Sequence, residues 1–270
     1  MTLIAVGEVE LDYERSGSGP PLLLIMGMSG TALHWGEPFL EALRRDFDVI
    51  AYDHRGVGAS SRLEGPITIV RMAEDAVGLL DALGIDAAHI VGISMGGMIA
   101  QELALAHPDR VRTLTLGCTY CGGEGSTLMA PELVKRMAEV RKSRDRDRIL
   151  RLTWEANVSA AQAEDAASYS TYCDISQERA VALSVIAAQV AAINGHDTSA
   201  RLPELAMPTL VVHGTADQVI PVENGRMVSS LIADSRFETF DGVGHLFFWE
   251  RPDRAAELVR EHATCASVSL

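Results

Sequence analysis

A serine stands inside a glycine-rich turn at residues 92–97, whose sequence is Gly-Ile-Ser-Met-Gly-Gly. The pattern G-x-S-x-G follows a run rich in β-branched residues and precedes a helix-forming run, which is the strand–turn–helix context that a serine nucleophile requires. The glycines allow close backbone approach, and Ser94 at a helix N-terminus lies where the dipole favours developing negative charge. Alone, the pattern arises by chance about one time in ten in such a chain. A simple helix N-cap is therefore the alternative interpretation of Ser94.

Two further residues complete the set that a serine nucleophile needs, in the order acid and then histidine. Asp217 lies on the loop after the predicted strand Thr209–His213, and His245 follows the predicted strand Arg236–Phe240. Because the carboxyl ends of parallel strands meet at one sheet edge, both side chains can converge on Ser94. The sequence thus predicts a catalytic triad in which His245 accepts the serine proton and Asp217 orients the imidazole. An aspartate in such a loop is otherwise a turn former.

The negative oxygen that develops in such a reaction needs two backbone N–H donors. Met95, directly after the serine, supplies one, and we expect Met28, in the turn after the first buried strand, to supply the other. Seven other histidines compete with His245 for the role of base. His54 and His213 are the nearest of these to the sheet edge, but neither follows the acid in the chain.

Short apolar runs alternate with amphipathic runs along most of the chain, which predicts a mostly parallel α/β sheet with crossover helices. The predicted strands are Leu22–Ile25, Phe47–Tyr52, His89–Ile93, Val111–Leu116, Thr209–His213 and Arg236–Phe240. The predicted helices are Pro38–Arg45, Val70–Leu83, Met95–His107, Val222–Ile232 and Pro252–His262. Alternation over Leu3–Tyr13 and a Ser-Gly-Ser-Gly break at 16–19 predict an N-terminal hairpin that leads into the first buried strand.

Residues 121–200 interrupt this rhythm, because they contain helical windows and no convincing strand. The windows are Pro131–Val140, Arg146–Asn157, Ala160–Ser170 and Gln177–Ile193. A helical insertion between two strands of an α/β sheet is expected to cover the carboxyl edge, where such folds bind ligands. We therefore predict a core of residues 1–120 and 201–270 with a helical cap of residues 121–200.

The composition of the chain disfavours nucleic acid and membrane as binding partners. The chain of 270 residues is 47% hydrophobic and has a formal net charge of −14, which disfavours a nucleic-acid partner because a phosphate backbone would be repelled. No apolar run is long enough to span a bilayer, and the N-terminal residues lack the basic region of a signal peptide. We expect a cytoplasmic protein that does not bind membranes and is a monomer or a homodimer.

The four cysteines include the pair Cys118 and Cys121, which spell C-x-x-C. A zinc site or redox role would need a second pair or clustered histidines nearby, and the sequence has neither. No phosphate-binding loop or nucleotide motif is present. The sequence therefore implies no metal and no cofactor.

These motifs resemble the α/β-hydrolase superfamily over about residues 9–259. The run from Asp53 to Ser60 is similar to the family's D-x-R-G-x-G-x-S turn, and residues 92–97 match its G-x-S-M-G-G elbow. Within the superfamily the chain resembles small bacterial esterases and lactonases, the group of 3-oxoadipate enol-lactonases, haloperoxidase-like perhydrolases and aclacinomycin methylesterase. Most members carry His-Gly before the oxyanion residue, whereas this chain has Met26 and Gly27. Another group must therefore hold this loop.

The triad favours hydrolysis of a small, mainly apolar carboxylic ester or lactone through an acyl-enzyme. The same triad serves perhydrolysis by hydrogen peroxide and carbon–carbon bond hydrolysis, and a non-catalytic ligand receptor on this scaffold is a further alternative. Substrate choice depends on the cap. Six side chains are candidates to line an apolar pocket, although each could equally be core: Tyr120, Met129, Trp154, Tyr172, Phe247 and Phe248.

Overall fold

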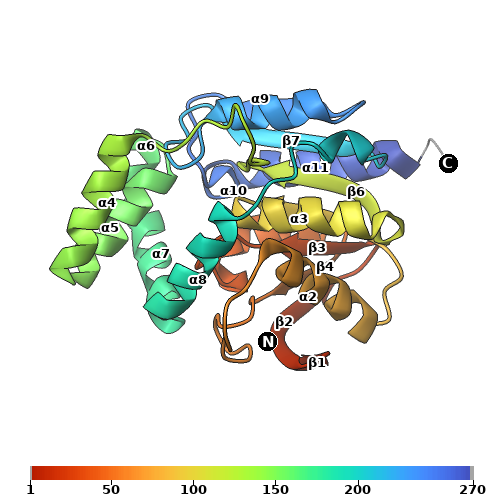
Figure 1. Ribbon diagram of the computed structural model, residues 1–270, viewed down its shortest axis with the longest axis horizontal. Helices are drawn as coiled ribbons and strands as arrows, with labels where there is room; N and C mark the ends of the chain where they lie inside the picture. Colours follow the sequence, from red (N-terminus) through yellow and green to blue (C-terminus); the bar gives the residue numbers. More distant parts are fainter. Residues whose placement is uncertain (1, 268–270) are drawn as a thin grey trace.

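Aliphatic runs bounded by turns form most of one eight-stranded sheet (Figure 1). The computed structural model describes residues 2–267. The strand order is β1-β2-β4-β3-β5-β6-β7-β8, and every neighbouring pair from β4 to β8 is parallel. The strands are β1 (Thr2–Val6), β2 (Val9–Gly17), β3 (Pro21–Ile25), β4 (Asp48–Tyr52), β5 (Ala88–Ile93), β6 (Val111–Gly117), β7 (Thr209–Gly214) and β8 (Arg236–Phe240). The predicted fold class is confirmed.

The N-terminal hairpin consists of β1 and β2, which turn at residues 7–8, where Gly7 has a φ of 56°. Strand β2 then pairs antiparallel with β4, with Tyr13 opposite Tyr52. The Ser-Gly-Ser-Gly segment is therefore not the turn of the hairpin. It carries the chain to β3, which lies between β4 and β5, so that Leu22 pairs with Val49 on one side and His89 on the other.

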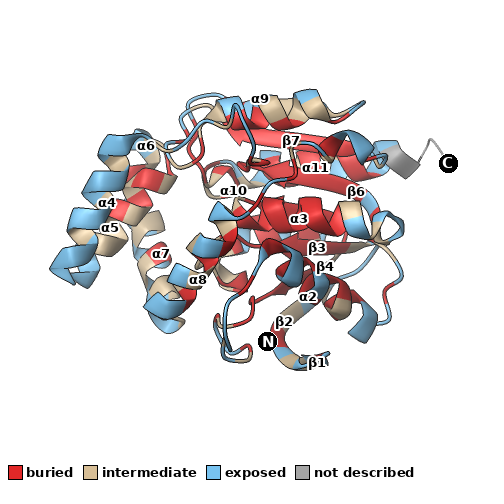
Figure 2. Cartoon of the chain, viewed as in Figure 1, coloured by how far each residue is buried: buried red, intermediate tan, exposed pale blue. Residues whose placement is uncertain are grey.

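Alternate residues of each strand face opposite layers of helices. Leu23 and Ile25 belong to a core cluster shared with α2, α3 and α9, whereas Leu22 and Leu24 belong to a cluster shared with α1 and α11. Figure 2 shows the central strands β3 to β7 almost wholly buried between these layers, as expected for parallel strands. The helices of the two layers are α1 (Glu37–Arg44), α2 (Ile69–Ala82), α3 (Met95–Ala106), α9 (Val222–Leu231) and α11 (Pro252–Ser267).

The ends of these helices follow local chemistry. The Thr68 hydroxyl accepts a hydrogen bond from the N–H of Arg71 at the start of α2, and Gly84, just past its end, adopts a φ of 68°. Helix α3 stops before Pro108, which cannot continue a helix. No helix in the described part of the chain combines the length and the apolar composition that crossing a membrane requires.

Five helices lie between β6 and β7 and project to one side of the sheet (Figure 1), and we call these helices and the loops that join them the cap, as a name for the segment only. They are α4 (Pro131–Ser143), α5 (Arg146–Asn157), α6 (Ala160–Ala163), α7 (Ala166–Glu178) and α8 (Leu183–Asn194). Two predicted boundaries are wrong. The window Ala160–Ser170 is divided because the Asp165 side chain accepts from the N–H of Ala167 and starts a new helix. That helix continues to Glu178, so the window Gln177–Ile193 is also divided.

Candidate active site

Ser94 occupies a strained turn between β5 and α3. Its φ of 58° and ψ of −123° lie outside the helical and strand regions, a conformation that costs about 1 to 3 kcal/mol and is typical of functional sites. The flanking glycines permit it. A β-carbon on Gly92 would lie 2.2 Å from the carbonyl oxygen of Gly96, and one on Gly96 would lie 2.0 Å from that of Ile25. The Ser94 N–H donates to the carbonyl of Gly117 at 2.9 Å, which fixes the turn to the end of β6.

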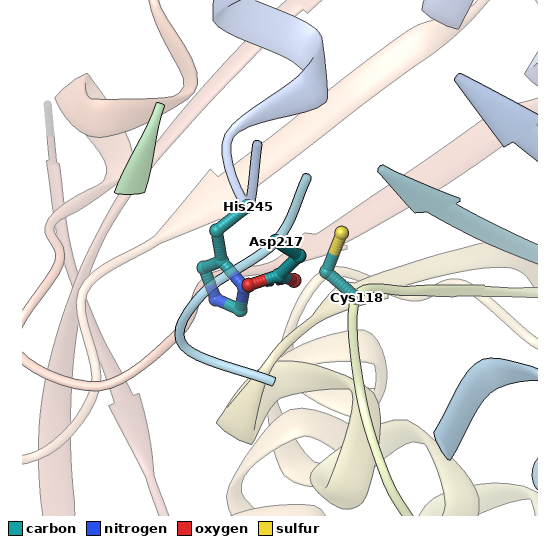
Figure 3. Close-up of side chains that lie close together, drawn as sticks. All are labelled: Cys118, Asp217 and His245. Carbon is teal, nitrogen blue, oxygen red and sulfur yellow. Dashed lines mark hydrogen bonds and ion pairs between the residues drawn. The ribbon is translucent and has the colours of Figure 1, made fainter. Parts of the chain in front are cut away.

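Asp217 and His245 meet at the same edge of the sheet (Figure 3). The distance between His245 Nδ1 and Asp217 Oδ2 is 2.7 Å, and the other carboxylate oxygen accepts from the N–H groups of Val219 and Ile220 at 2.8 and 2.9 Å. Because a carboxylate only accepts, Nδ1 carries the proton, and Nε2 of the neutral ring is left as an acceptor. The loop after β7 therefore fixes both the orientation and the tautomer of His245.

The surroundings of Asp217 keep it ionised. Burial alone would raise the pKa of this carboxyl, but the adjacent His245 and hydrogen bonds from His213 and His245 outweigh burial and hold the pKa well below its usual range. His213 Nε2 lies 2.8 Å from the carbonyl of Ile220 and 3.3 Å from Asp217 Oδ2. Considered from the sequence only as a rival base, His213 instead supports the acid.

Cys118 lies beside this pair at the end of β6. Among the described residues, Cys118, Asp217 and His245 bring potential metal ligands within 4.8 Å of one another (Figure 3). Metal binding there would require loss of the thiol proton, whereas burial raises the pKa of Cys118 well above its usual value. The cluster is better explained as a buried thiol packed beside an acid–histidine pair.

The loop after β3 lies against Ser94. A β-carbon on Gly27 would lie 3.1 Å from the β-carbon of Ser94, so the predicted donor Met28 is one residue from this close approach. The second predicted donor, Met95, is the first residue of α3 and is fully buried. The structure thus places both residues next to Ser94 in the chain or in space.

His54 holds the loop after β3 in place. Its Nε2 donates to the carbonyl of Met26 at 2.8 Å, and burial lowers the pKa of its imidazole, so the ring stays neutral. From the sequence alone, His54 is only a rival base, and this contact is not predicted. The available signal was topological: His54 follows β4, which lies beside β3, so its side chain reaches the turn that begins at Met26.

Comparison with known proteins agrees with this geometry. A sequence model described as the α/β hydrolase fold matches residues 20–252. The chain belongs to the α/β-hydrolase fold family. It is 33% identical over 258 residues to a provisionally named carbamate hydrolase of Azorhizobium caulinodans, with 94% of each chain covered. It is 30% identical to the 2-hydroxymuconate semialdehyde hydrolase of Pseudomonas sp. strain CF600, with 99% of this chain and 95% of that protein covered.

Among solved structures, the enol-lactonase from Burkholderia xenovorans LB400 superposes with a TM-score of 0.84 at 27% identity, covering 97% of this chain and 100% of that chain. The superposition therefore extends over the cap as well as the sheet. Together these similarities support the conclusion that the protein is a hydrolase. The names of the relatives indicate that they act on different substrates.

Aromatic side chains join the cap of this α/β hydrolase to the loop that carries the histidine. Trp154 of α5 lies 5.2 Å from Tyr172 of α7 and 5.6 Å from Trp249, measured between ring centroids. Trp249 is four residues beyond His245, and its indole N–H donates to the carbonyl of His34 at 2.7 Å. The predicted candidates Trp154 and Tyr172 therefore lie between cap and core, whereas Trp249 was not predicted.

The other four candidate lining residues are distributed differently. Tyr120 is half-buried, and its hydroxyl donates to the carbonyl of Ile193 in α8 at 3.2 Å, while Met129 is half-buried in the loop before α4. Phe247 and Phe248 lie in the short helix α10 (Phe247–Glu250) and pack into the core cluster shared with α1 and α11. Both rings are buried in this cluster, which favours core packing, the alternative that the sequence leaves open for each of the six side chains.

Backbone contacts fasten the cap to the loop of His245. Glu250 accepts hydrogen bonds from the N–H of Gly244 and from the N–H of Ser159, both at 2.8 Å. The N–H of Leu246, the residue after the histidine, donates to the carbonyl of Asn157 at 2.8 Å. The position of His245 is therefore coupled to the end of α5.

A buried ion cluster fastens the other end of the cap. Arg179, just past α7, contacts Asp12 at 2.6 Å and Asp53 at 2.9 Å, and both carboxylates are almost fully buried. Asp53 also accepts from the N–H of Ala32 at 2.7 Å, just beyond the loop of Met28. The family's D-x-R-G turn thus connects the cap to the loop beside Ser94.

Proposed function

We propose that this hydrolase cleaves a carboxylic ester or lactone of a small, mainly apolar substrate through an acyl-enzyme on Ser94. The observation that carries the proposal is the 2.7 Å contact between His245 Nδ1 and Asp217 Oδ2, which leaves Nε2 as a proton acceptor. The pair of His245 and Asp217 lies at the edge of the sheet where Ser94 is held in a strained turn at the start of α3. A nucleophile, a base of fixed tautomer and an ionised acid suit acyl transfer.

The reaction then runs in two halves. Ser94 Oγ attacks the acyl carbon while His245 Nε2 takes the hydroxyl proton, and the N–H groups of Met28 and Met95 bind the oxyanion. Collapse of the tetrahedral intermediate expels the alkoxide, which receives that proton from His245. Water, deprotonated by the same nitrogen, attacks the acyl-enzyme, and the carboxylic acid leaves as Ser94 regains its proton.

Substrate preference follows from the residues that cover the site. We propose that residues 121–200 form a cap over the carboxyl edge of the sheet, with the rings of Trp154, Tyr172 and Trp249 between cap and core. These rings favour an apolar substrate. The likeness to an enol-lactonase structure supports a lactone or enol ester as one member of the substrate class.

Two relatives supply alternative substrates for the same nucleophile. A carbamate would give a carbamoyl-enzyme on Ser94, and the provisionally named carbamate hydrolase relative favours its inclusion among the candidates. Carbon–carbon bond hydrolysis of a diketone would use the same triad, and 2-hydroxymuconate semialdehyde, which the name of a second relative gives as that protein's substrate, is a further candidate. Perhydrolysis uses the acyl-enzyme with hydrogen peroxide in place of water.

Steady-state kinetics of Ser94→Ala test the proposal. Turnover of p-nitrophenyl butyrate should fall by about 10⁴-fold or more, while thermal unfolding and circular dichroism stay close to wild type. Ser230→Ala, at an exposed serine of α9, is the matched control and should keep full activity. Wild-type rates in Ser94→Ala would overturn the proposal. A panel of simple esters, lactones, carbamates and a diketone, each assayed with and without peroxide, then ranks the substrate classes.

A further inference from the structure

Gln189 connects the cap to the loop beside the nucleophile. It lies in α8, its side chain is fully buried, and its Oε1 accepts a hydrogen bond of 2.9 Å from the N–H of Ser29. Ser29 follows the predicted oxyanion donor Met28 and adopts a left-handed φ of 58°. With the Ser29 N–H engaged by the cap, the neighbouring N–H of Met28 is left for the substrate.

The orientation of this amide is fixed by chemistry. Because the backbone N–H of Ser29 is a donor, the Gln189 atom that faces it must be the carbonyl oxygen. The NH₂ group is then the other end of the amide, about 2.2 Å from that oxygen by covalent geometry. Among the described residues this buried Nε2 has no hydrogen-bond partner. A buried donor without a partner has lost its hydrogen bonds to water, so a ligand oxygen that accepts from it would be favoured at this position.

A second buried glutamine shows that this is not a general property of glutamine in this fold. Gln101 in α3 is also fully buried, yet its Nε2 donates to the carbonyl of Tyr120 at 3.1 Å and its Oε1 accepts from the hydroxyl of Thr198. Gln101 therefore has both ends of its amide bonded within the protein, whereas Gln189 has one end bonded and one end free.

The free end lies close to the site. Ser29 is two residues from Gly27, at which a β-carbon would lie 3.6 Å from Ser94 Oγ. Helix α8 is also held at the end of β6 by the bond from the Tyr120 hydroxyl to Ile193. Figure 1 shows α8 leading from the cap to the sheet edge where α3 begins. The amide is thus enclosed between the cap and the loop that faces the nucleophile.

We propose that Nε2 of Gln189 donates a hydrogen bond to a second oxygen acceptor of the substrate, so that the enzyme prefers an ester or lactone carrying an additional keto or ether oxygen. This inference rests on the proposed function. The donor is neutral and the chain carries a net charge of −14. Two buried carboxylates, Asp12 and Asp53, already engage Arg179 near this loop. An uncharged acceptor therefore suits the position better than a second carboxylate.

The proposal is tested with pairs of esters that differ by one oxygen-bearing group, either in the acyl half or in the alcohol half of the ester. In the acyl half, p-nitrophenyl 4-oxopentanoate is compared with p-nitrophenyl 4-methylpentanoate. In the alcohol half, 2-methoxyethyl butyrate is compared with butyl butyrate. Rates of alkaline hydrolysis of the same esters correct for intrinsic reactivity. We expect the wild type to favour the oxygen-bearing member of at least one pair by about tenfold in kcat/KM, the value of one hydrogen bond.

Two variants separate recognition from loop support. Gln189→Glu keeps an acceptor for the Ser29 N–H and, as the carboxylate, lacks the donor, whereas Gln189→Met lacks both at every pH. Recognition predicts that the preference falls to about one in both variants, whereas loop support alone predicts that kcat/KM falls equally for both members of each pair and leaves the preference unchanged. Gln101→Met is the control, and it should lower the thermal stability while leaving the preference unchanged.

Each outcome decides between the alternatives. A wild-type enzyme with no preference in either pair, or a Gln189→Met variant that keeps the wild-type preference, would overturn the role of Gln189 in recognition. Either result is compatible with Ser94-dependent ester hydrolysis. Failure of the wild type to turn over any of the four esters would instead count against the proposed function.

Discussion

Replacing Asp217 by asparagine changes one acceptor into a donor at almost constant shape. The remaining amide oxygen would stay with the N–H groups of Val219 and Ile220, as carboxylate Oδ1 does now. The amide NH₂ would then face Nδ1 of His245, where the carboxylate oxygen accepts at 2.7 Å. Two donors cannot bond, so the imidazole proton would move to Nε2. That nitrogen could no longer take the proton of Ser94.

A tautomer change of this kind lowers kcat about 10⁴-fold in serine proteases, equivalent to about 5.5 kcal/mol of transition-state stabilisation. We expect a loss of the same order for Asp217→Asn, measured as initial rates with p-nitrophenyl butyrate at neutral pH. Substrate affinity should change little, because Asp217 contacts the histidine and not the substrate. A kcat within tenfold of wild type would refute the inference that Asp217 fixes the tautomer.

The same variant tests the electrostatics of the site. Because the folded-state pKa of Asp217 lies below its unfolded value, its ionised form stabilises the protein above about pH 4, and this contribution is lost as pH falls through the folded pKa. We therefore expect Asp217→Asn to lower the free energy of unfolding at pH 7, with the difference shrinking in acid. Urea titrations of both proteins at several pH values measure this difference in the free energy of unfolding. Equal free energies of unfolding for wild type and Asp217→Asn at pH 7 would show that the ionised Asp217 does not stabilise the folded protein.

Three further changes test the supports around the site. His54→Phe removes the donor to Met26, and we expect kcat to fall about 10- to 100-fold with little change in KM; an unchanged kcat would show that His54 does not support the loop. Arg179→Met leaves two buried carboxylates unpaired, and urea denaturation should show a loss of about 3 kcal/mol; a loss below about 1 kcal/mol would contradict this account. Burial lowers the pKa of His196 to about 4, so the protein should lose stability as pH falls from 6.5 towards 4. His196→Gln should flatten this dependence, by up to about 3 kcal/mol, in the same titrations, and an unchanged slope would refute the assignment.

The sheet and the candidate triad residues could be predicted because their signals are local. Strands buried on both faces must be short aliphatic runs, and all six predicted parallel strands lie within a residue or two of β3 to β8. The turn around Ser94 needs glycines at fixed positions because backbone atoms approach too closely for a β-carbon. Asp217 and His245 follow from strand order alone, since consecutive parallel strands end at one edge.

The supports around these residues depend on contacts between distant segments, which no local pattern records. Gln189 meets Ser29 across 160 residues, and neither residue belongs to a recognisable motif. His54 became interpretable only once β4 was placed beside β3. Phe247 follows the histidine closely in sequence, but the turn into α10 directs its ring towards Phe240 in the core. Hydrophobicity alone cannot tell a pocket wall from a packed core.

In the proposed mechanism Ser94 carries the acyl group during turnover. Wild-type enzyme turning over p-nitrophenyl butyrate can be quenched in acid within milliseconds and digested, and its peptides analysed by mass spectrometry. The peptide containing Ser94 should gain the mass of one butyryl group, and His245→Gln, which deacylates slowly, should accumulate any adduct that it forms. Ser94→Ala should show no adduct at this peptide. An unmodified Ser94 under conditions of rapid turnover, or an adduct on another residue that matches the rate of turnover, would contradict the account.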